Sequence, residues 1–367
     1  MNKKITMLAF SLEHGGAEKV CVTLCNELVK RNYDIELWIV NYSETALLRQ
    51  LDSRVSVFRL NREHVRNCMF PLLKLFVQQK PEKILIFHIE LAILAIVLKK
   101  MFFLKTKIFV RSINTLSHAF NNVKFSLRNY FMLKVIKNIL SNAHKIIAQS
   151  NGMREDLIKS FNIERNKIST IYNPAINILA NKNAVSEETC IENEFLFVGR
   201  LSPQKGLINL IKAFKLAYEE KSNIHLTLVG EGTEKEMLKK MVNDLGLISV
   251  VSFEGYQENT LTYFKRVKAT LLTSFFEGFP NVLVESIAMG TPVIAFNCPC
   301  GPEDIIVPGV NGILVPHLNV EDFSKAILAI AYKDIKFNRT EIIDTSKRFS
   351  TTTIVKQYEK VLFEDYL

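Results

Sequence analysis

The feature that most restricts the fold is a repeated alternation of short, β-branched apolar runs with longer stretches of helical periodicity. Seven such runs occur in the first half of the chain, at residues 5–10, 35–40, 55–60, 83–88, 107–111, 145–149 and 168–172. Five more follow, at 194–199, 225–230, 250–253, 269–273 and 292–296. Strands that alternate with helices form a parallel sheet covered by helices on both faces. The pattern therefore predicts an α/β protein with two doubly wound, Rossmann-like domains facing a cleft.

A change in composition separates the two series of runs. Residues 173–194 lose the alternation and are rich in Asn, Glu, Lys, Ser and Thr, as is typical of an interdomain linker. The chain has 367 residues, which is enough for two domains that each bury a core. We therefore predict a first domain at 1–175, a linker at 176–193 and a second domain at 194–350.

Positive charge is confined to the first part of the chain. Residues 1–190 contain 28 basic and 15 acidic residues, whereas the remainder contains 19 and 22. Between residues 91 and 154 there are eleven Lys or Arg and no Asp or Glu. Such a one-sided basic field indicates an anionic partner. We do not expect this partner to be nucleic acid, because no RNA-binding signature accompanies the charge.

The cysteines and the apolar runs bear on the compartment. The six cysteines have neither a disulfide framework nor a zinc spacing, which is typical of reduced thiols in a cytoplasmic protein. The apolar run at 5–10 is too short for a signal peptide. The stretch at 84–98 contains His88 and Glu90 and is too short to span a bilayer. We therefore expect a cytoplasmic protein with no transmembrane segment.

Ligands of open parallel sheets bind outside the carboxyl ends of the strands, where loops lead into helices. The first such loop carries Gly15 and Gly16 before a helix. Two glycines let the backbone approach a ligand, and a helix N-terminus favours an anion. A simple tight turn is the alternative interpretation of this pair.

The corresponding loops of the second domain carry charged residues. Arg200 and Lys205 follow the run at 194–199 and can converge on one anion, although two solvated surface charges would give the same pattern. Gly230 and Glu231 follow the next run. These positions make the second domain the better candidate for a phosphate-binding site.

The richest loop of the second domain contains two carboxylates. Glu277 precedes a helix that is predicted to begin near Asn281, and Glu285 lies about one turn into that helix. Free N–H groups near Asn281 and Val282 would hold an anion between the two carboxylates. Two carboxylates also occur in hydrolases that pair a general acid with a base. The neighbouring cations and the helix N-terminus favour a phosphate-bearing substrate instead.

At these residues the chain resembles the retaining glycosyltransferases of family 4, of the bacterial surface-polysaccharide and lipopolysaccharide type, which share the two-Rossmann GT-B fold. The resemblance extends over essentially the whole chain. It implies that a helix at 351–367 returns to the first domain. It rests on residues 15–18, 148–150, 171–174, 198–200, 205–206, 229–232, the E-x7-E pattern from Glu277 to Glu285, 290–295 and 309–312.

The resemblance implies a role for each matched residue. Arg200 and Lys205 would be catalytic by neutralising the nucleotide diphosphate as it leaves. Glu277 would be catalytic through its contact with the transferred sugar, and Glu285 would bind the ribose. Gly16 would lie against the diphosphate when the domains close. The full set of implied donor-binding residues is Gly15, Gly16, Gly199, Gly230, Glu231, Gly278, Phe279, Pro280, Asn281, Val282 and Glu285.

The resemblance also implies a reaction. A hexose or an N-acetylhexosamine would pass from a UDP-sugar to a lipid-linked glycan acceptor with formation of an α-glycosidic bond. No metal or other cofactor would be required, and the chain contains no D-x-D motif. The setting would be polysaccharide, lipopolysaccharide or capsule assembly. A same-fold nucleotide-sugar epimerase or phosphorylase and a catalytically silent scaffold are the alternatives.

The acceptor side is where the chain departs from the family pattern. Relatives often have a histidine, or a Glu-His-Asn patch, after the strand corresponding to 107–111, whereas this chain has Arg111 and Asn114 there. Arg111, Asn114 and His118 are the acceptor candidates, and a helix-start or surface histidine is the alternative for His118. His14 and His88 are similarly ambiguous.

Aromatic residues interleave with cations between residues 120 and 137. This mixture suits the surface of an anionic membrane. We therefore predict that the first domain docks peripherally on the cytoplasmic face of the inner membrane. A solvated helix face over a buried aromatic stripe is the alternative.

Overall fold

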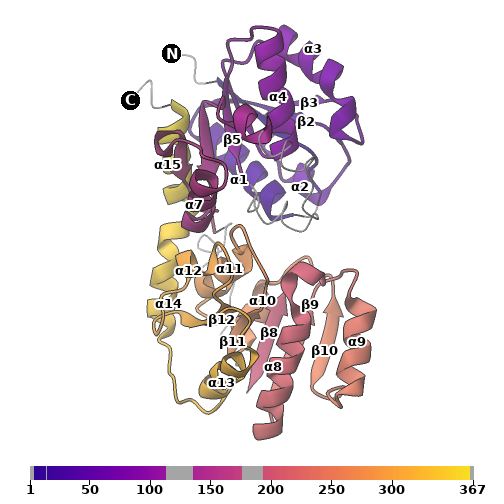
Figure 1. Cartoon of the computed structure of the whole chain (residues 1–367), viewed down its shortest axis with the longest axis vertical. Helices are drawn as coiled ribbons and strands as arrows, with labels where there is room; N and C mark the ends of the chain where they lie inside the picture. Colours follow the sequence, from indigo (N-terminus) through magenta and orange to yellow (C-terminus); the bar gives the residue numbers. More distant parts are fainter. Residues whose placement is uncertain (1–3, 14, 113–134, 176–192, 364–367) are drawn as a thin grey trace. The chain divides into compact units, whose positions relative to one another are not determined.

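The computed structural model describes residues 4–13, 15–112, 135–175 and 193–363 (Figure 1). The chain divides into two compact units. Unit 1 comprises Met1–Ile176 and Thr351–Leu367, and unit 2 comprises Asn177–Ser350. Apart from Asn193, the predicted linker lies outside the described residues.

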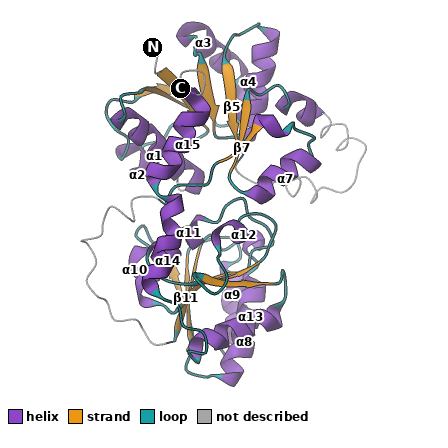
Figure 2. Ribbon diagram, turned by 90° about the vertical axis from the view of Figure 1, so that its left-hand side faces the viewer, coloured by secondary structure: helices purple, strands orange, loops and turns teal. Residues whose placement is uncertain are grey.

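Unit 1 is built on a seven-stranded sheet. Its strands are β1 (Lys4–Ala9), β2 (Asp34–Ile39), β3 (Ser56–Arg59), β4 (Lys83–Ile86), β5 (Lys107–Arg111), β6 (Lys145–Ala148) and β7 (Ile168–Thr170). They lie in the order β3-β2-β1-β4-β5-β6-β7, and every neighbouring pair is parallel. Its helices include α1 (Gly16–Lys30), α2 (Ala46–Arg49), α3 (Met69–Gln79), α4 (Ile89–Met101), α7 (Asn151–Lys159) and α15 (Thr351–Phe363), and residues 135–140 are also helical. Figure 2 shows α1 and α15 on one side of these strands and α4 and α7 on the other.

Unit 2 repeats this architecture on a six-stranded parallel sheet. Its strands are β8 (Glu194–Val198), β9 (His225–Val229), β10 (Val251–Gly255), β11 (Ala269–Leu272), β12 (Val293–Phe296) and β13 (Gly312–Val315), in the order β10-β9-β8-β11-β12-β13. Its helices are α8 (Leu207–Glu220), α9 (Lys235–Asp244), α10 (Leu261–Arg266), α11 (Asn281–Ala288), α12 (Pro302–Ile305), α13 (Val320–Ala331) and α14 (Arg339–Ser346). The prediction of two doubly wound α/β units is confirmed.

The central strands are buried along their whole length, as expected where helices cover both faces of a parallel sheet. Strand β4 is buried at each of its four residues, including Lys83. The ammonium of Lys83 is compensated by a hydrogen bond of 2.9 Å to the carbonyl oxygen of Leu362 in α15. The buried lysine therefore ties the sheet to the end of the chain.

Helix α15 packs into the core of unit 1. Ile354, Tyr358 and Leu362 are fully buried in the same cluster as the inward face of α1. An ion pair of 2.5 Å joins Arg31 Nη1, just after α1, to Glu359 Oε2. The apolar stripe and this pair explain why residues 351–363 fold onto the unit that begins the chain. In the part of the chain that the structure describes, no helix is both long and apolar enough to cross a bilayer.

Candidate active site

The candidate site of unit 2 lies where the strand order reverses. Strand β8 is flanked by β9 on one side and by β11 on the other. Loops that follow two such strands leave the sheet in opposite directions and open a crevice at their carboxyl ends. The two loops are residues 199–206 and 273–280, which are the loops that the sequence analysis selected.

Direct contacts join the two loops. Lys205 Nζ lies 2.6 Å from Glu277 Oε1, and Ser274 Oγ donates to the same oxygen at 2.6 Å. Gln204 Nε2 donates to the carbonyl oxygen of Phe276 at 2.9 Å. Ser274 and Gln204 were not among the predicted site residues, although both lie within these two loops. Together these bonds fix a carboxylate and an ammonium side by side.

The ion pair is largely shielded from solvent. The side chain of Lys205 is 18% exposed and that of Glu277 is 8% exposed. A carboxylate at this depth requires compensating donors, which Lys205 and Ser274 supply. Burial raises the pKa of the neighbouring Cys298 thiol strongly, the charge of Glu277 adds to this effect and Lys205 opposes it. Cys298 therefore stays protonated and is a poor nucleophile.

Two glycines allow the loops to approach each other. Gly206 has a φ of 61°, and a Cβ built there would lie 2.3 Å from the carbonyl oxygen of Thr273. Gly230 has a φ of 142°, and a Cβ there would lie 1.9 Å from the carbonyl oxygen of Gly199. A larger residue at 206 would push the loop of Lys205 away from Thr273, and one at 230 would push the loop after β9 away from Gly199. Arg200, which follows Gly199, is exposed.

The remaining donor-side candidates lie around the start of α11 and after β9. Helix α11 begins at Asn281, and the N-terminus of a helix favours an anion. Gly278, Phe279 and Pro280 are buried before it, and Phe279 packs edge-on against Phe349 with ring centroids 5.6 Å apart. Asn281, Val282 and Glu285 are partly exposed. Glu231 is exposed and forms an ion pair of 2.6 Å with Lys235.

The first-domain candidates surround the strand-order reversal of unit 1, between β1 and β4. Gly15 precedes α1, and the Glu18 side chain folds back so closely that a Cβ at Gly15 would collide with its carboxylate. His88, at the start of α4, packs edge-on against Phe10 with ring centroids 5.7 Å apart. Burial lowers the pKa of His88, while Glu18 and Glu90 oppose that shift. Gly16 is exposed as the first residue of α1.

Arg111 is the one acceptor-side candidate that lies within the described residues. Arg111 is fully buried, not exposed on a loop. It donates from Nη2 to Asn173 Oδ1 at 2.6 Å and from Nε to the Tyr358 hydroxyl at 3.2 Å. It also lies 5.4 Å from the centroid of the Phe87 ring. Because α15 covers the end of β5, these contacts anchor that helix and give no support to an acceptor role. Asn114, His118 and His14 lie outside the described residues.

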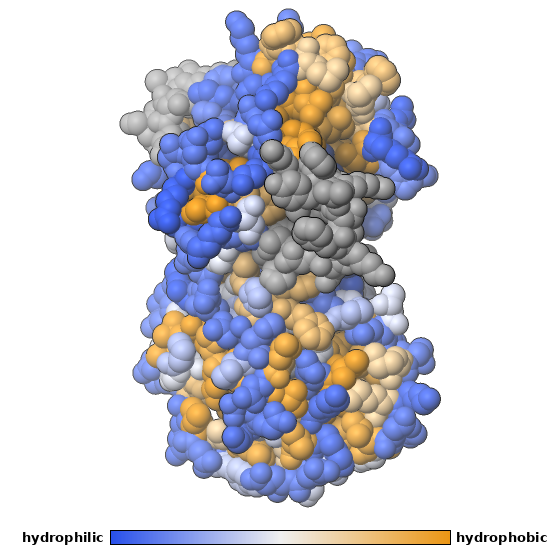
Figure 3. All heavy atoms as spheres, viewed as in Figure 1, coloured by the Kyte–Doolittle hydropathy of each residue, from blue (hydrophilic) through white to orange (hydrophobic). Residues whose placement is uncertain are grey.

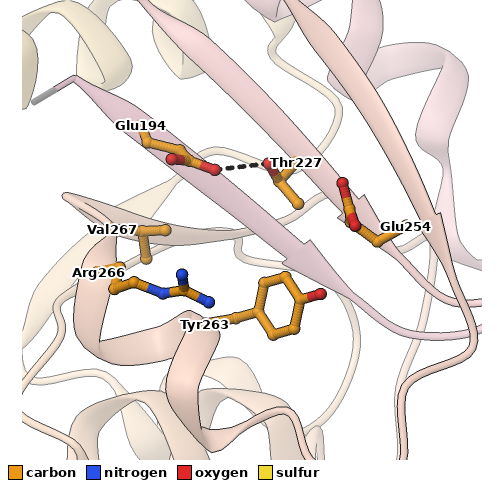
Figure 4. A pocket seen from close by; sticks show the side chains of 6 residues that line it. All are labelled: Glu194, Thr227, Glu254, Tyr263, Arg266 and Val267. Atoms are coloured by element: carbon orange, nitrogen blue, oxygen red, sulfur yellow. Dashed lines mark hydrogen bonds between the residues drawn. The ribbon is translucent and has the colours of Figure 1, made fainter. Parts of the chain in front are cut away.

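A separate pocket of about 290 Å³ lies between α10 and the face of the sheet (Figure 4). Tyr263 and Arg266 approach it from α10, and Glu194 accepts a hydrogen bond of 2.6 Å from Thr227 Oγ1 across its strands. Glu254 and Val267 complete its lining. None of the predicted donor-site residues lines this pocket, so it is distinct from the candidate site.

Comparisons with known proteins agree with this arrangement. The family described as Glycosyltransferase Family 4 matches residues 14–175, and that described as Glycosyl transferases group 1 matches residues 181–344. The chain is similar to the N-acetylgalactosamine-N,N'-diacetylbacillosaminyl-diphospho-undecaprenol 4-alpha-N-acetylgalactosaminyltransferase of Campylobacter jejuni, with 26% identity over 94% of this chain and 97% of the relative. It is also similar to the amylovoran biosynthesis glycosyltransferase AmsD of Erwinia amylovora, with 23% identity over 99% of this chain and 100% of the relative. The crystal structure of Anabaena HepE in complex with UDP-glucose shares the fold, with a TM-score of 0.77 and 21% identity over 98% of this chain and 99% of that one.

Proposed function

The chain belongs to the family 4 glycosyltransferases and is an enzyme that transfers glycosyl groups, and from this premise we propose that it moves a hexose or an N-acetylhexosamine from a UDP-sugar to a glycan acceptor. The observation that carries the proposal is the pair of Lys205 and Glu277, held at 2.6 Å where the strand order of unit 2 reverses. The bound UDP-glucose of the Anabaena neighbour supports a UDP-linked donor. The names of the Campylobacter and Erwinia relatives support a role in the assembly of lipid-linked glycans or polysaccharides. Within that class we propose lipopolysaccharide or capsule assembly.

We assign the leaving group to the cations of this site. Lys205 and Arg200 would already hold positive charge beside the diphosphate before the reaction begins. Little reorganisation of the site would therefore be needed when UDP departs. The first N–H groups of α11, at Asn281 and Val282, would hold the diphosphate from another side. Glu285 would then bind the ribose and Glu277 the transferred sugar. With these cations available, we propose that the reaction needs neither a metal ion nor another cofactor.

We propose that the transfer retains the anomeric configuration and forms an α-glycosidic bond. The state of Glu277 supports a route without a covalent glycosyl-enzyme. Its Oε1 already accepts bonds from Lys205 and Ser274, and a carboxylate engaged by two donors is a weak nucleophile. The acceptor hydroxyl would instead attack on the face that the diphosphate leaves.

We propose a lipid-linked acceptor, presented at the cytoplasmic face of a membrane. The name of the Campylobacter relative specifies an acceptor linked to diphospho-undecaprenol, which supports this class. The basic, aromatic stretch predicted to meet the membrane lies mostly outside the described residues, since residues 113–134 are not described.

Thermal unfolding with UDP, GDP, ADP and NAD, each in EDTA, tests the donor proposal. A ligand at about 100 times its dissociation constant adds roughly 2.7 kcal/mol to the free energy of unfolding, which is readily measured as a rise in Tm. We expect a rise with UDP and none with NAD. Product analysis with UDP-sugars then separates transfer from epimerisation or phosphorolysis. No shift with any nucleotide would contradict the proposed donor site and favour a silent scaffold.

A further inference from the structure

Helices α3 and α4 are apolar on the side that faces away from the sheet as well as on the side that packs against it. Inward, Leu72 and Phe76 of α3 are buried. Outward on the same helix, Phe70 is 73% exposed and Val77 is 56% exposed. Met101, at the end of α4, is 59% exposed. A helix that is apolar all round is normally buried on every side, so this outer side lacks its expected partner.

The segments that follow the two helices lie side by side in unit 1. Thr106 Oγ1 donates to the carbonyl oxygen of Pro81 at 2.7 Å, and the Lys107 amide donates to the carbonyl oxygen of Glu82 at 2.8 Å. These bonds hold the segment after α3 beside the segment after α4. In the latter, Phe102 is 47% exposed and Phe103 is 90% exposed.

We call this surface the α3–α4 face. It comprises Met69, Phe70, Val77, Met101, Phe102 and Phe103. Among the described residues of unit 1, Val135 is the one further exposed large apolar side chain, so exposed apolar area is concentrated here. Figure 3 shows orange and pale-orange atoms gathered over α3 and α4. A contiguous exposed apolar patch on a folded unit marks an interaction site.

The charges around the face select the kind of partner. Between residues 66 and 105 the chain carries seven Lys or Arg, of which six lie outside the core and Lys83 is buried, and two acidic residues. Lys74 lies on α3 between Phe70 and Val77 and is exposed, and Lys100 precedes Met101. The face is therefore apolar with a cationic border, which complements an anionic surface that has an apolar interior.

The same lysines weigh against a protein partner. Lysine is depleted from the centre of protein interfaces, where its charge would be stranded. A two-fold dimer formed through this face would bring the lysines of both copies into one interface, because such an interface uses the same patch twice. At a bilayer, by contrast, lysine extends its ammonium to the headgroups while its stem lies along apolar side chains.

We propose that the α3–α4 face is the surface by which this protein docks on an anionic lipid bilayer. Phe70, Val77, Met101, Phe102 and Phe103 enter the boundary between headgroups and acyl chains, and Lys74, Lys100 and Lys105 lie among the headgroups. The functional reason for docking, which is access to a lipid-linked acceptor, rests on the proposed function. The docking surface itself is inferred from these residues alone. This surface shares no residue with the stretch at 120–137, which the sequence predicted to meet the membrane.

Flotation of the full chain with vesicles tests the proposal. One vesicle is phosphatidylcholine alone, and the other is an equal mixture of phosphatidylcholine and phosphatidylglycerol, each at low and high salt. We expect binding to the mixed vesicles that weakens at high salt. The double variant Phe70→Ser with Phe103→Asn removes two exposed rings, and we expect a drop of roughly tenfold or more in the partition coefficient. Asparagine is chosen at 103 because it tolerates the φ of 52° found there.

A second pair of variants tests the charges. Lys100→Gln with Lys105→Gln is expected to lower binding to the mixed vesicles by about fivefold for each lysine removed, with little change for phosphatidylcholine. Matched controls come from unit 2. Ile248→Ser removes an apolar side chain that is 71% exposed, and Lys239→Gln removes an exposed lysine. Both controls are expected to bind as the unaltered chain does.

Three results would overturn the proposal. The first is equal, negligible binding of the unaltered chain to both vesicles, and the second is unchanged binding of the variant at Phe70 and Phe103. The third is that the unaltered chain binds no vesicle but forms a dimer in light scattering, and that this variant is monomeric. The UDP-induced rise in Tm is measured on the same samples. If the chain floats with vesicles but UDP does not raise its Tm, the proposed donor function alone is refuted. If UDP raises the Tm but the chain does not float, the docking surface alone is refuted.

Discussion

Lys205 Nζ and Glu277 Oε1 lie 2.6 Å apart although 72 positions separate the two residues. Each residue belongs to the loop that follows one of two adjacent strands, β8 and β11. The pair places the cation proposed for the leaving group against the carboxylate proposed for the sugar. An arriving diphosphate would compete with Glu277 for Lys205, and donor binding would thereby change the environment of the carboxylate.

Removal of Lys205 is the direct test of this relationship. Lys205→Ala is expected to lower kcat/KM by about 100-fold or more, because the substitution removes a cation that the site already holds beside the diphosphate. It also leaves Glu277 buried with one donor fewer, which is expected to cost roughly 1–3 kcal/mol of unfolding free energy. Initial rates of sugar transfer and urea unfolding measure the two effects.

The matched control for this variant is Lys215→Ala, which breaks the exposed pair of 3.3 Å between Lys215 and Glu219 on α8. It is expected to change both quantities little. Glu277→Gln should also lower the rate strongly, and the double variant should lose less than the sum of the two single losses, because the residues act as a pair. Normal rates in both single variants would show that the donor site lies elsewhere.

The loop that carries Lys205 depends on Gly206. Gly206→Ala is expected to destabilise the protein by about 2 kcal/mol or more and to weaken the UDP-induced rise in Tm, since its Cβ would meet the carbonyl oxygen of Thr273. Gly246→Ala is the control, because Gly246 has a similar φ of 67° with nothing within 4 Å of a built Cβ. It isolates backbone strain, expected at about 1 kcal/mol. Equal losses in both variants would exclude a role for the close contact.

The sequence predicts those features of the fold that depend on local patterns of residues. Each β-branched run in the first half of the chain corresponds to a strand, because strand and helix periodicities are local. Strand β13 was not predicted, since it begins at Gly312, within the glycine-containing segment at 309–312. The loops of the donor site could be paired, because the carboxyl ends of parallel strands meet at one edge of a sheet.

The contacts of Arg111 lie beyond such signals. Its partner Tyr358 is 247 positions away, and nothing in the local pattern around 107–111 reveals that a distant helix covers the end of β5. Long-range packing therefore decides the contacts of Arg111. Ser274 differs, because it is only three positions from Glu277, and a loop serine acquires its role once that carboxylate is buried beside it.

Tyr358→Phe is expected to destabilise the protein by about 1–3 kcal/mol. The Arg111 guanidinium is buried, and its Nη1 already has no hydrogen-bond partner among the described residues. Loss of the Tyr358 hydroxyl would leave Nε unpaired as well. Tyr332→Phe, which removes an exposed hydroxyl bonded to the carbonyl oxygen of Glu220, is the control in urea unfolding. An equal, small effect of both substitutions would show that Arg111 does not depend on this bond.

Stability is expected to fall as the pH is lowered towards 5.5, partly because of His88. Burial lowers the pKa of His88 in the folded state, so the unfolded chain binds a proton more readily than the folded one. The resulting loss begins near the ordinary histidine pKa of about 6.5 and levels off below the folded-state pKa. His88→Gln should flatten this part of the profile of Tm against pH, whereas His225→Gln, at an exposed site in unit 2, should not. A profile that His88→Gln leaves unaltered would contradict the assignment.

Transfer activity is expected to persist in EDTA, because Lys205 and the exposed Arg200 would supply the positive charge that a divalent ion supplies in other phosphate-dependent enzymes. Rates with EDTA should stay within about twofold of rates with added Mg²⁺, a difference of less than 0.5 kcal/mol in the barrier. Arg200→Ala should lower the rate equally in both conditions, since no metal ion stands in for the lost guanidinium. If EDTA abolished transfer and Mn²⁺ or Mg²⁺ restored it, a metal ion would neutralise part of the charge on the leaving group. The proposal that Arg200 and Lys205 suffice for this would then be wrong. If Mg²⁺ restored the rate of Arg200→Ala, a metal ion would replace the lost guanidinium, and the predicted equal loss in both conditions would be wrong.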